Sequence, residues 1–191
     1  MTTQSSGLSE TAERILSQAT AWMDDNPGEF PTTRKLCELA GVTAPTLYHH
    51  FGDKEGLMLA VAERKLQSFF QGKRRQPETA DPQADLIKGW NQWIDFARKH
   101  AALIGALQQS PAISARLPTG AEAIAMGRLQ RLAQVEPLRM PLQQAAQMVV
   151  AASNVVVQLM QQGMPDSEVR AVSAELQSAV LIALKQGKRT S

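Results

Sequence analysis

The side chains best equipped for chemistry gather in one short stretch, TLYHHF at residues 46–51. It holds the chain's only tyrosine and two of its three histidines. Hydroxyl and imidazole groups can bind phosphate oxygens and the edges of nucleic-acid bases. Adjacent histidines on a helix point ~100° apart, so they cannot chelate one ion as a pair spaced at three or four residues can. The pattern therefore favours hydrogen bonding over metal binding, and we expect no metal site.

The composition limits the class of protein. The 191 residues carry a net charge of +2, with 43% hydrophobic and 20% charged residues. No apolar run approaches the ~20 residues that span a bilayer, and the first residues, MTTQSSGLSETAE, lack the pattern of a signal peptide. Cys37 is the single cysteine, which rules out an internal disulfide and a multi-cysteine metal site. We therefore expect a cytoplasmic protein without a cofactor, and any nucleic-acid binding must depend on where charges lie, since their sum is small.

The chain that must position these groups is predicted to be helical throughout. Apolar residues recur at spacings of three and four, no run alternates as a strand does, and every proline except Pro45 falls between periodic segments. The expected class is all-α: an N-terminal three-helix helix-turn-helix head followed by a C-terminal antiparallel helical bundle, about nine helices in all. The helices are expected at about 9–25, 32–41, 44–51, 53–75, 86–97, 101–107, 119–134, 141–162 and 166–186.

Around TLYHHF, local signals predict two short helices and a tight turn. The first helix opens at Thr32 or Thr33, and Gly41 can adopt the left-handed conformation that ends it. The second begins after Thr43, a good N-cap, and carries Pro45 in its first turn, where the missing N–H is harmless. A helix, a short glycine-containing turn and a second helix form a helix-turn-helix, whose second helix lies in the major groove of DNA.

The flanking charges suit the DNA backbone. Leu47 and Phe51, four residues apart, are expected to face inward and leave the polar side chains of the second helix outside. Lys54 opens the next helix, with Asp53 as its cap, where free N–H groups favour a phosphate. Arg34, in the first turn of the preceding helix, would reach a phosphate from the other side.

The run TTRKLCELAGVTAPTLYHHFGDKEGL, residues 32–57, resembles the DNA-binding motif of the TetR family of bacterial transcription regulators. The resemblance rests on the spacing of Ala40-Gly41-Val42, Leu47-Tyr48, His50-Phe51, Lys54 and Leu57, and covers roughly residues 10–60. It implies a DNA-binding domain at 1–52 and a ligand-binding and dimerisation domain at 53–191. It also implies a sequence-specific regulator, in most cases a repressor that a small molecule releases from its operator.

By the same resemblance, specific side chains would bind double-stranded DNA. The backbone set is Thr33, Arg34, Thr46, Tyr48, His50 and Lys54, and the base-facing set is Ala44, Pro45, Thr46 and His49; Thr43, at the N-cap, completes the site. Ala44 is small at a position where a longer polar side chain would fix the identity of a base. His50 has an alternative role as a structural hydrogen-bonding residue that packs the motif.

The resemblance further implies a homodimer and an unidentified small-molecule effector. Broad apolar surfaces on the helices at 141–162 and 166–186 predict that these two pair with a second copy. Candidate pocket residues are Trp90, Trp93, His100, Met126, Met148, Asn154 and Gln158, although apolar helical stripes are core by default. Lys73, Arg74 and Arg75 are expected to complement a helix dipole and to stay solvated.

The alternative is an all-α small-molecule-binding protein or enzyme without DNA binding. An enzyme would use His100 or the pair His49 and His50 as its base. Neither paired carboxylates near a histidine nor a phosphate loop nor an activated nucleophile is visible in the sequence. We therefore expect no enzymatic activity and no membrane partner.

Overall fold

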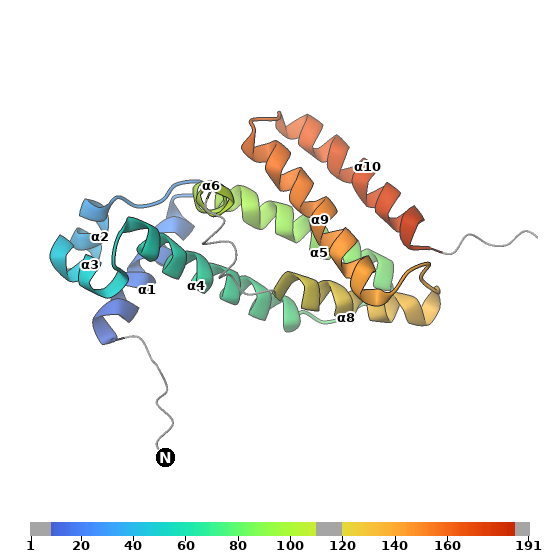
Figure 1. Ribbon diagram of the computed structural model, residues 1–191, viewed down its shortest axis with the longest axis horizontal. Helices are drawn as coiled ribbons and strands as arrows, with labels where there is room; N and C mark the ends of the chain where they lie inside the picture. The colour runs from blue at the N-terminus through green and yellow to red at the C-terminus, as the bar shows by residue number, and fades with distance from the viewer. Residues whose placement is uncertain (1–8, 110–119, 186–191) are drawn as a thin grey trace, which may run out of the picture. The chain divides into compact units, whose positions relative to one another are not determined.

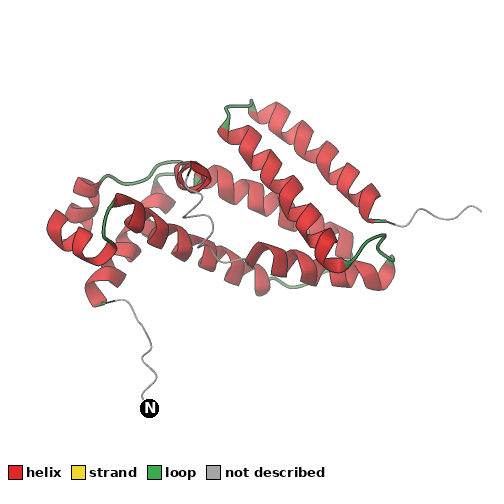
Figure 2. Ribbon diagram, viewed as in Figure 1, coloured by secondary structure: helices red, strands yellow, loops and turns green. Residues whose placement is uncertain are grey.

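The computed structural model describes residues 9–109 and 120–185, and all regular structure in these residues is helical (Figures 1 and 2). The only bridge of the β type found there is an isolated pair between Leu138 and Lys185. The predicted all-α class is thereby confirmed. The described helices are α1 (Glu10–Asp25), α2 (Thr33–Ala40), α3 (Ala44–Phe51), α4 (Lys54–Arg74), α5 (Pro82–Lys99), α6 (Ala101–Gln109), α8 (Gly120–Val135), α9 (Leu142–Gln161) and α10 (Asp166–Leu184).

The chain divides into two compact units. The first comprises residues 1–68 and 100–118, and the second comprises residues 69–99 and 119–191. The division falls inside α4, whereas the domain boundary expected from the sequence lies at 52/53, just before this helix. The functional division into 1–52 and 53–191 stays a prediction, and the two units are described separately below.

The first unit is built around a small core to which α1, α2, α3 and the start of α4 contribute. Its centre is made of apolar side chains that are at most 4% exposed: Ile15, Leu16, Ala19 and Met23 of α1, Leu36 and Ala40 of α2, Leu47 of α3 and Leu57 of α4. Side-chain hydrogen bonds, among them the following two, connect its helices. Arg14 donates from Nε to the carbonyl oxygen of Ala40 at 3.1 Å, and the buried Lys65 of α4 donates to Asp24 of α1 at 2.7 Å. These contacts hold α2 and the first part of α4 against α1.

The second unit is a bundle in which α5 packs on α8 and α9, and α9 packs on α10. The last two helices run antiparallel and are joined by a tight turn (Figure 1). Gly163, in this turn, has φ +88°, which favours glycine. Trp90 of α5 donates from Nε1 to Ser173 Oγ of α10 at 3.0 Å, so a buried indole is satisfied inside the bundle.

The broad apolar surface expected on the last two helices is largely used within the chain. Ala145, Ala146, Val149 and Val156 of α9 and Val169, Val180 and Leu184 of α10 are all at most 8% exposed. The expectation that this whole surface would be open in a monomer is therefore wrong, because α5 and α8 cover one side of α9. Two large apolar side chains of these helices stay open, Val155 of α9 at 46% exposure and Ile182 of α10 at 71% exposure.

Candidate nucleic-acid interface and effector cavity

The turn between α2 and α3 has the geometry that its sequence predicts. Thr32 Oγ1 accepts from Lys35 N at 3.2 Å and caps α2. Gly41 ends the helix with φ 61° and ψ 42°, in the left-handed region. Thr43 Oγ1 then accepts from Thr46 N at 3.4 Å and caps α3, with Pro45 in the first turn. The two helices are thus joined by a helix-turn-helix turn.

The recognition helix α3 has one buried side and one open side. Leu47 is fully buried against the core, while His49 and Pro45 are exposed. Tyr48 is half-buried and its hydroxyl lies 2.9 Å from Thr33 Oγ1, which connects α3 to the first turn of α2. The hydroxyl oxygen retains capacity for a further hydrogen bond. The contacts of Leu47 and Tyr48 therefore hold the helix in place, and its polar groups face outward.

His50 has a contact inside the protein as well as an open edge. Its Nδ1 lies 3.4 Å from Ser9 Oγ, the N-cap residue of α1, and its ring meets those of His49 and Phe51 edge-on. This geometry supports the alternative in which His50 packs the motif. The ring is half-buried, and a direct contact between His50 and a phosphate stays a prediction.

Two cations stand at helix starts that suit phosphate. Lys54 is the first residue of α4 and is exposed, and Asp53 Oδ1 accepts from Gly56 N at 2.8 Å as the predicted cap. Arg34, in the first turn of α2, has a side chain that is 91% exposed and pairs with Glu38 at 3.2 Å. Such an exposed pair is worth at most ~1 kcal/mol, so Arg34 can exchange it for a phosphate.

All ten residues predicted to bind DNA lie in the first unit, and none is buried. Arg34, Thr43, Pro45, His49 and Lys54 are exposed, and Thr33, Ala44, Thr46, Tyr48 and His50 are half-buried. The structure brings them together on α3 and on the starts of α2 and α4. Their contact with DNA stays a prediction.

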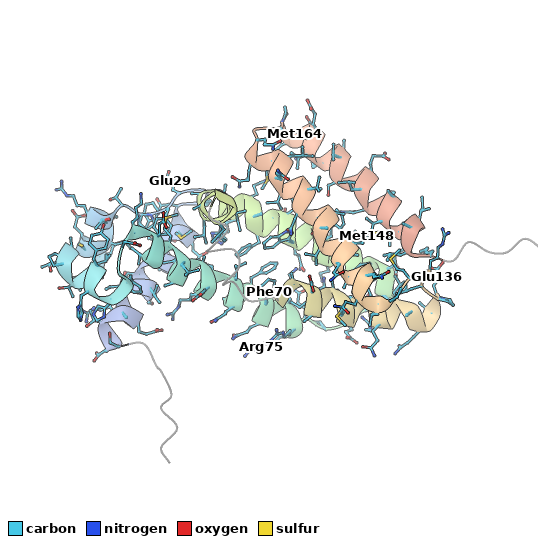
Figure 3. All side chains as sticks on the ribbon, in the orientation of Figure 1. Glu29, Phe70, Arg75, Glu136, Met148 and Met164 are labelled. Atoms are coloured by element: carbon cyan, nitrogen blue, oxygen red, sulfur yellow. The ribbon has the colours of Figure 1, made fainter. Side chains whose placement is uncertain are left out.

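A second candidate site lies within the second unit. An aromatic cavity of ≈ 70 Å³ is bounded by α4, α5, α8 and α9; its walls include Phe69, Phe70, Trp90, Trp93, Ile124 and Val149. Figure 3 labels Phe70 near the C-terminal end of α4. A Cβ added to Gly120 would lie 2.6 Å from the Phe70 ring, so the glycine at the start of α8 makes room for this wall.

The aromatic wall is a connected cluster. The ring of Phe69 lies 4.5 Å from that of Phe96 and 5.9 Å from that of Trp93, between centroids. Trp93 donates from Nε1 to Asn154 Oδ1 at 3.0 Å, which links α5 to α9 at the edge of the cavity. These contacts hold the aromatic rings in place around the apolar space.

The sequence-based list of pocket residues is divided by the structure. Trp90, Trp93 and Asn154 line the aromatic cavity. Three other candidates lie in the second unit but do not line the aromatic cavity: Met126, Met148, which Figure 3 labels on α9, and Gln158. The fourth, His100, is buried in the first unit. A role for these four in binding an effector is untested.

Two cations at the cavity were missed by the sequence reasoning. Lys73 was expected to be solvated, but it is 8% exposed, and its Nζ lies 4.8 Å over the Phe69 ring centroid. The expectation is wrong because α5 and α8 cover this face of α4; Arg74 and Arg75 are exposed as expected. Arg128 of α8, half-buried, also lines the cavity. The only local signal was the spacing of Phe69 and Lys73, which are neighbours on a helix.

Other kinds of site are not found in the part of the chain described here. Within residues 9–109 and 120–185, no group of three or more His, Cys, Asp or Glu side chains is arranged to hold a metal ion. None of the described helices combines the length and apolar character that a membrane span needs.

The comparisons with known proteins agree with this arrangement. Residues 15–61 match the family model described as bacterial regulatory proteins, tetR family. The matched segment contains α2, α3 and all ten predicted DNA-binding residues, so the family resemblance stated from the sequence is confirmed. No curated protein matches the chain by sequence.

Solved structures share the fold over nearly the whole chain. The transcriptional regulator FadR from Bacillus subtilis, in complex with stearoyl-CoA, has a TM-score of 0.64 and 17% identity, covering 90% of this chain and 98% of that one. The TetR-family transcriptional regulator PfmR from Thermus thermophilus has a TM-score of 0.61 and 20% identity, covering 91% and 100%. A protein of unknown function from a Rhodococcus species has a TM-score of 0.67 and 16% identity, covering 96% and 100%.

Proposed function

From the premise that residues 15–61 belong to the tetR family of bacterial regulatory proteins, we propose that this chain is a cytoplasmic homodimeric repressor. It binds a specific DNA operator through α3 and is released from it by a small molecule. The observation that carries the proposal is the helix-turn-helix itself: α3 is docked through the buried Leu47, with His49 and Pro45 exposed on its open side. The enzymatic alternative has no comparable support, because the family consists of regulators.

In this proposal, α3 enters the major groove and the helix starts of α2 and α4 hold the backbone. His49 faces base edges, together with Ala44, Pro45 and Thr46, because these lie at the open N-terminal part and outer side of the helix. Tyr48, Arg34 and Lys54 bind phosphates and so fix the register of the helix on the duplex.

Two copies are needed to read an operator with two half-sites. We assign the contact between them to the open face of α9 and α10, whose apolar members are Val155 and Ile182 and whose small members include Ala151, Ala171 and Ala174. Small side chains let helices from two copies approach closely, and a four-helix interface of this kind is self-complementary.

The effector acts through α4 in this proposal. Lys54 opens this helix near the DNA, and Phe69, Phe70 and Lys73, at its other end, line the aromatic cavity. A ligand that favours one arrangement of the cavity walls therefore favours one position of α4, which is a population shift between two states. A useful switch needs a coupling of ~1–3 kcal/mol between ligand and operator.

The test is a titration of full-length protein with fluorescent fragments of the DNA that flanks its own gene. We expect sequence-selective binding that weakens steeply with salt, because each phosphate contact releases counterions. Tyr48→Phe and Lys54→Ala should weaken it, whereas Lys88→Ala, an exposed lysine of α5 in the second unit, should not. Equal affinity for flanking and unrelated DNA would reject the proposal in favour of a binding protein without DNA recognition.

A further inference from the structure

A second, polar space adjoins the aromatic cavity and shares lining residues with it. We call this space the basic recess: it has a volume of ≈ 320 Å³ and carries five cationic side chains, Lys73, Arg74, Lys88, Arg128 and Arg131. Lys73, Ile124 and Arg128 line both spaces. A molecule that occupies both would therefore have an apolar end among aromatic rings and a polar end among cations.

Both acidic residues of the basic recess, Glu78 and Asp85, form ion pairs with Arg131. Arg131 donates from Nη1 to Asp85 at 2.6 Å, and its Nε lies 3.1 Å from Glu78 Oε2. The hydrogen bonds from Arg131 and from Thr79 hold the pKa of Asp85 well below its usual range, at about 2. Asp85 and Glu78 thus form direct ion pairs with Arg131, whereas Asp85 acts on Arg128 only through its charge at longer range.

Lys73 and Arg128 are the cations of the basic recess that combine burial with the lack of an ion pair. In residues 9–109 and 120–185, no carboxylate lies within ion-pair distance of either one. Lys73 donates to the neutral amide of Gln92 and stands over the Phe69 ring. Burial lowers the pKa of Lys73 to about 7 and also lowers the pKa of Arg128. An anion placed between them would supply the missing charge.

The position of the Arg128 guanidinium depends on a glycine. A Cβ added to Gly89 of α5 would lie 1.2 Å from Arg128 Nη1 and 2.5 Å from Cζ. Glycine in a helix interior is unfavourable, yet here it lets the guanidinium lie directly against the backbone of α5. The helix is thereby shaped to hold this cation at the border of the two spaces.

We propose that the effector is an amphipathic anion: a compact apolar group fills the aromatic cavity, and a carboxylate or phosphate binds between Lys73 and Arg128. The inference rests on the proposed function, because it names the chemical class of the effector for the same cavity. A cationic ligand would meet the charge of Arg128, and that of Lys73 whenever Lys73 is protonated, whereas an anion stabilises both charges and favours the protonated form of Lys73.

The test compares four compounds that share one apolar body. Binding of 4-phenylbutyrate, 4-phenylbutyl phosphate, 4-phenylbutan-1-ol and 4-phenylbutylammonium to the full-length protein is measured by calorimetry in the absence of DNA. We expect at least one anion to bind about tenfold or more tightly than the alcohol, since hydrogen bonds to charged groups are the stronger ones. The ammonium compound should bind most weakly. The ratio between carboxylate and phosphate shows which head group the site prefers.

Substitutions in the protein distinguish the contribution of the two cations from that of the apolar cavity. Arg128→Gln and Lys73→Met should each reduce the preference for the anion and leave the affinity for the alcohol within about twofold. Gly89→Ala should reduce the preference too, because it keeps the charge and displaces the guanidinium. Arg139→Gln, which removes an exposed arginine of the second unit that lines neither space, is the matched control and should keep the preference.

Three results would overturn the inference: no binding of either anion, equal affinity for anion and alcohol, or a preference that survives Arg128→Gln and Lys73→Met together. Because these measurements need no DNA, they can fail while operator binding is intact. Conversely, a protein that prefers anions but does not bind its operator would contradict the proposed repressor function and would still support the proposed effector class.

Discussion

At the residue scale, we expect His49 and Lys54 to contribute differently to DNA binding. His49→Ala removes a base-edge group and should cost about 1–3 kcal/mol on the best operator, with relaxed selectivity at one base pair. Lys54→Ala removes a phosphate contact and should weaken binding to every sequence, lowering the salt slope by about one. Anisotropy titrations on the operator and its single-base variants, at several salt concentrations, measure both. A uniform loss with His49→Ala would contradict its placement at a base.

Lys73 should give the protein a characteristic dependence of stability on pH. Its folded-state pKa is lowered from 10.5 to about 7, first by burial and then by the charges of Arg128 and Lys88, with Asp95 acting in the opposite direction. Between these two values the unfolded chain binds a proton that the folded protein lacks, so raising the pH stabilises the fold. Below about pH 7 both states hold the proton, and this contribution to the slope disappears.

The measurement is urea unfolding at pH 7, 8 and 9. The free energy of unfolding should rise with pH by at most about 1.4 kcal/mol per unit for this one proton. Lys73→Met should flatten that rise, and Lys35→Met, which removes an exposed lysine of α2, should leave it unchanged. An unaltered slope in Lys73→Met would mean that this ammonium stays protonated when buried.

At the element scale, the turn between α2 and α3 should be sensitive at Gly41. Its φ of +61° is a left-handed conformation, and a Cβ there costs about 1–2 kcal/mol. Gly41→Ala should therefore lower the free energy of unfolding by that amount and weaken operator binding with it. Gly127→Ala is the control: it lies in α8 with nothing within 4 Å of an added Cβ, and should stabilise by up to about 1 kcal/mol. Thermal unfolding of the two variants gives the comparison.

The elements that could be predicted from the sequence are those with local signals. Thr32, Gly41, Thr43 and Asp53 each act within three or four residues of their own position, so their capping roles and the helix ends they define follow from the chain itself. Proline positions set most other helix limits in the same local way.

What could not be predicted depends on which helix covers which face. Periodicity shows that α4 and α8 each have an apolar side, but Lys73 and Arg128 lie at the border of that side, where burial depends on α5. Met126 and Met148 have side chains that suit a pocket, but they are not among the residues that line the aromatic cavity, and their role in effector binding stays a prediction. The burial of Lys73 and Arg128 depends on contacts between helices, which the spacing of residues within one helix does not reveal.

At the scale of the whole molecule, the proposed dimer depends on the open face of α9 and α10. Val155→Glu together with Ile182→Glu would place two carboxylates per copy in the interface, where an unpaired charge costs several kcal/mol. We expect the double variant to be monomeric at micromolar concentration and to lose operator binding, because one copy reaches only one half-site. Its unfolding temperature should change little at these exposed sites, apart from the part that dimerisation supplies.

The matched control is Val135→Glu, since Val135 is equally open at 69% exposure and lies at the end of α8, outside the proposed face. Sedimentation equilibrium on the three proteins distinguishes a surface-charge effect from loss of the interface. If the double variant still sediments as a dimer, two copies must meet through another surface, and the spacing of the two recognition helices would have to be derived from that surface. If it becomes monomeric and still binds the operator with full affinity, dimerisation is not required for selectivity. In that case a single recognition helix α3 would account for recognition of the operator sequence.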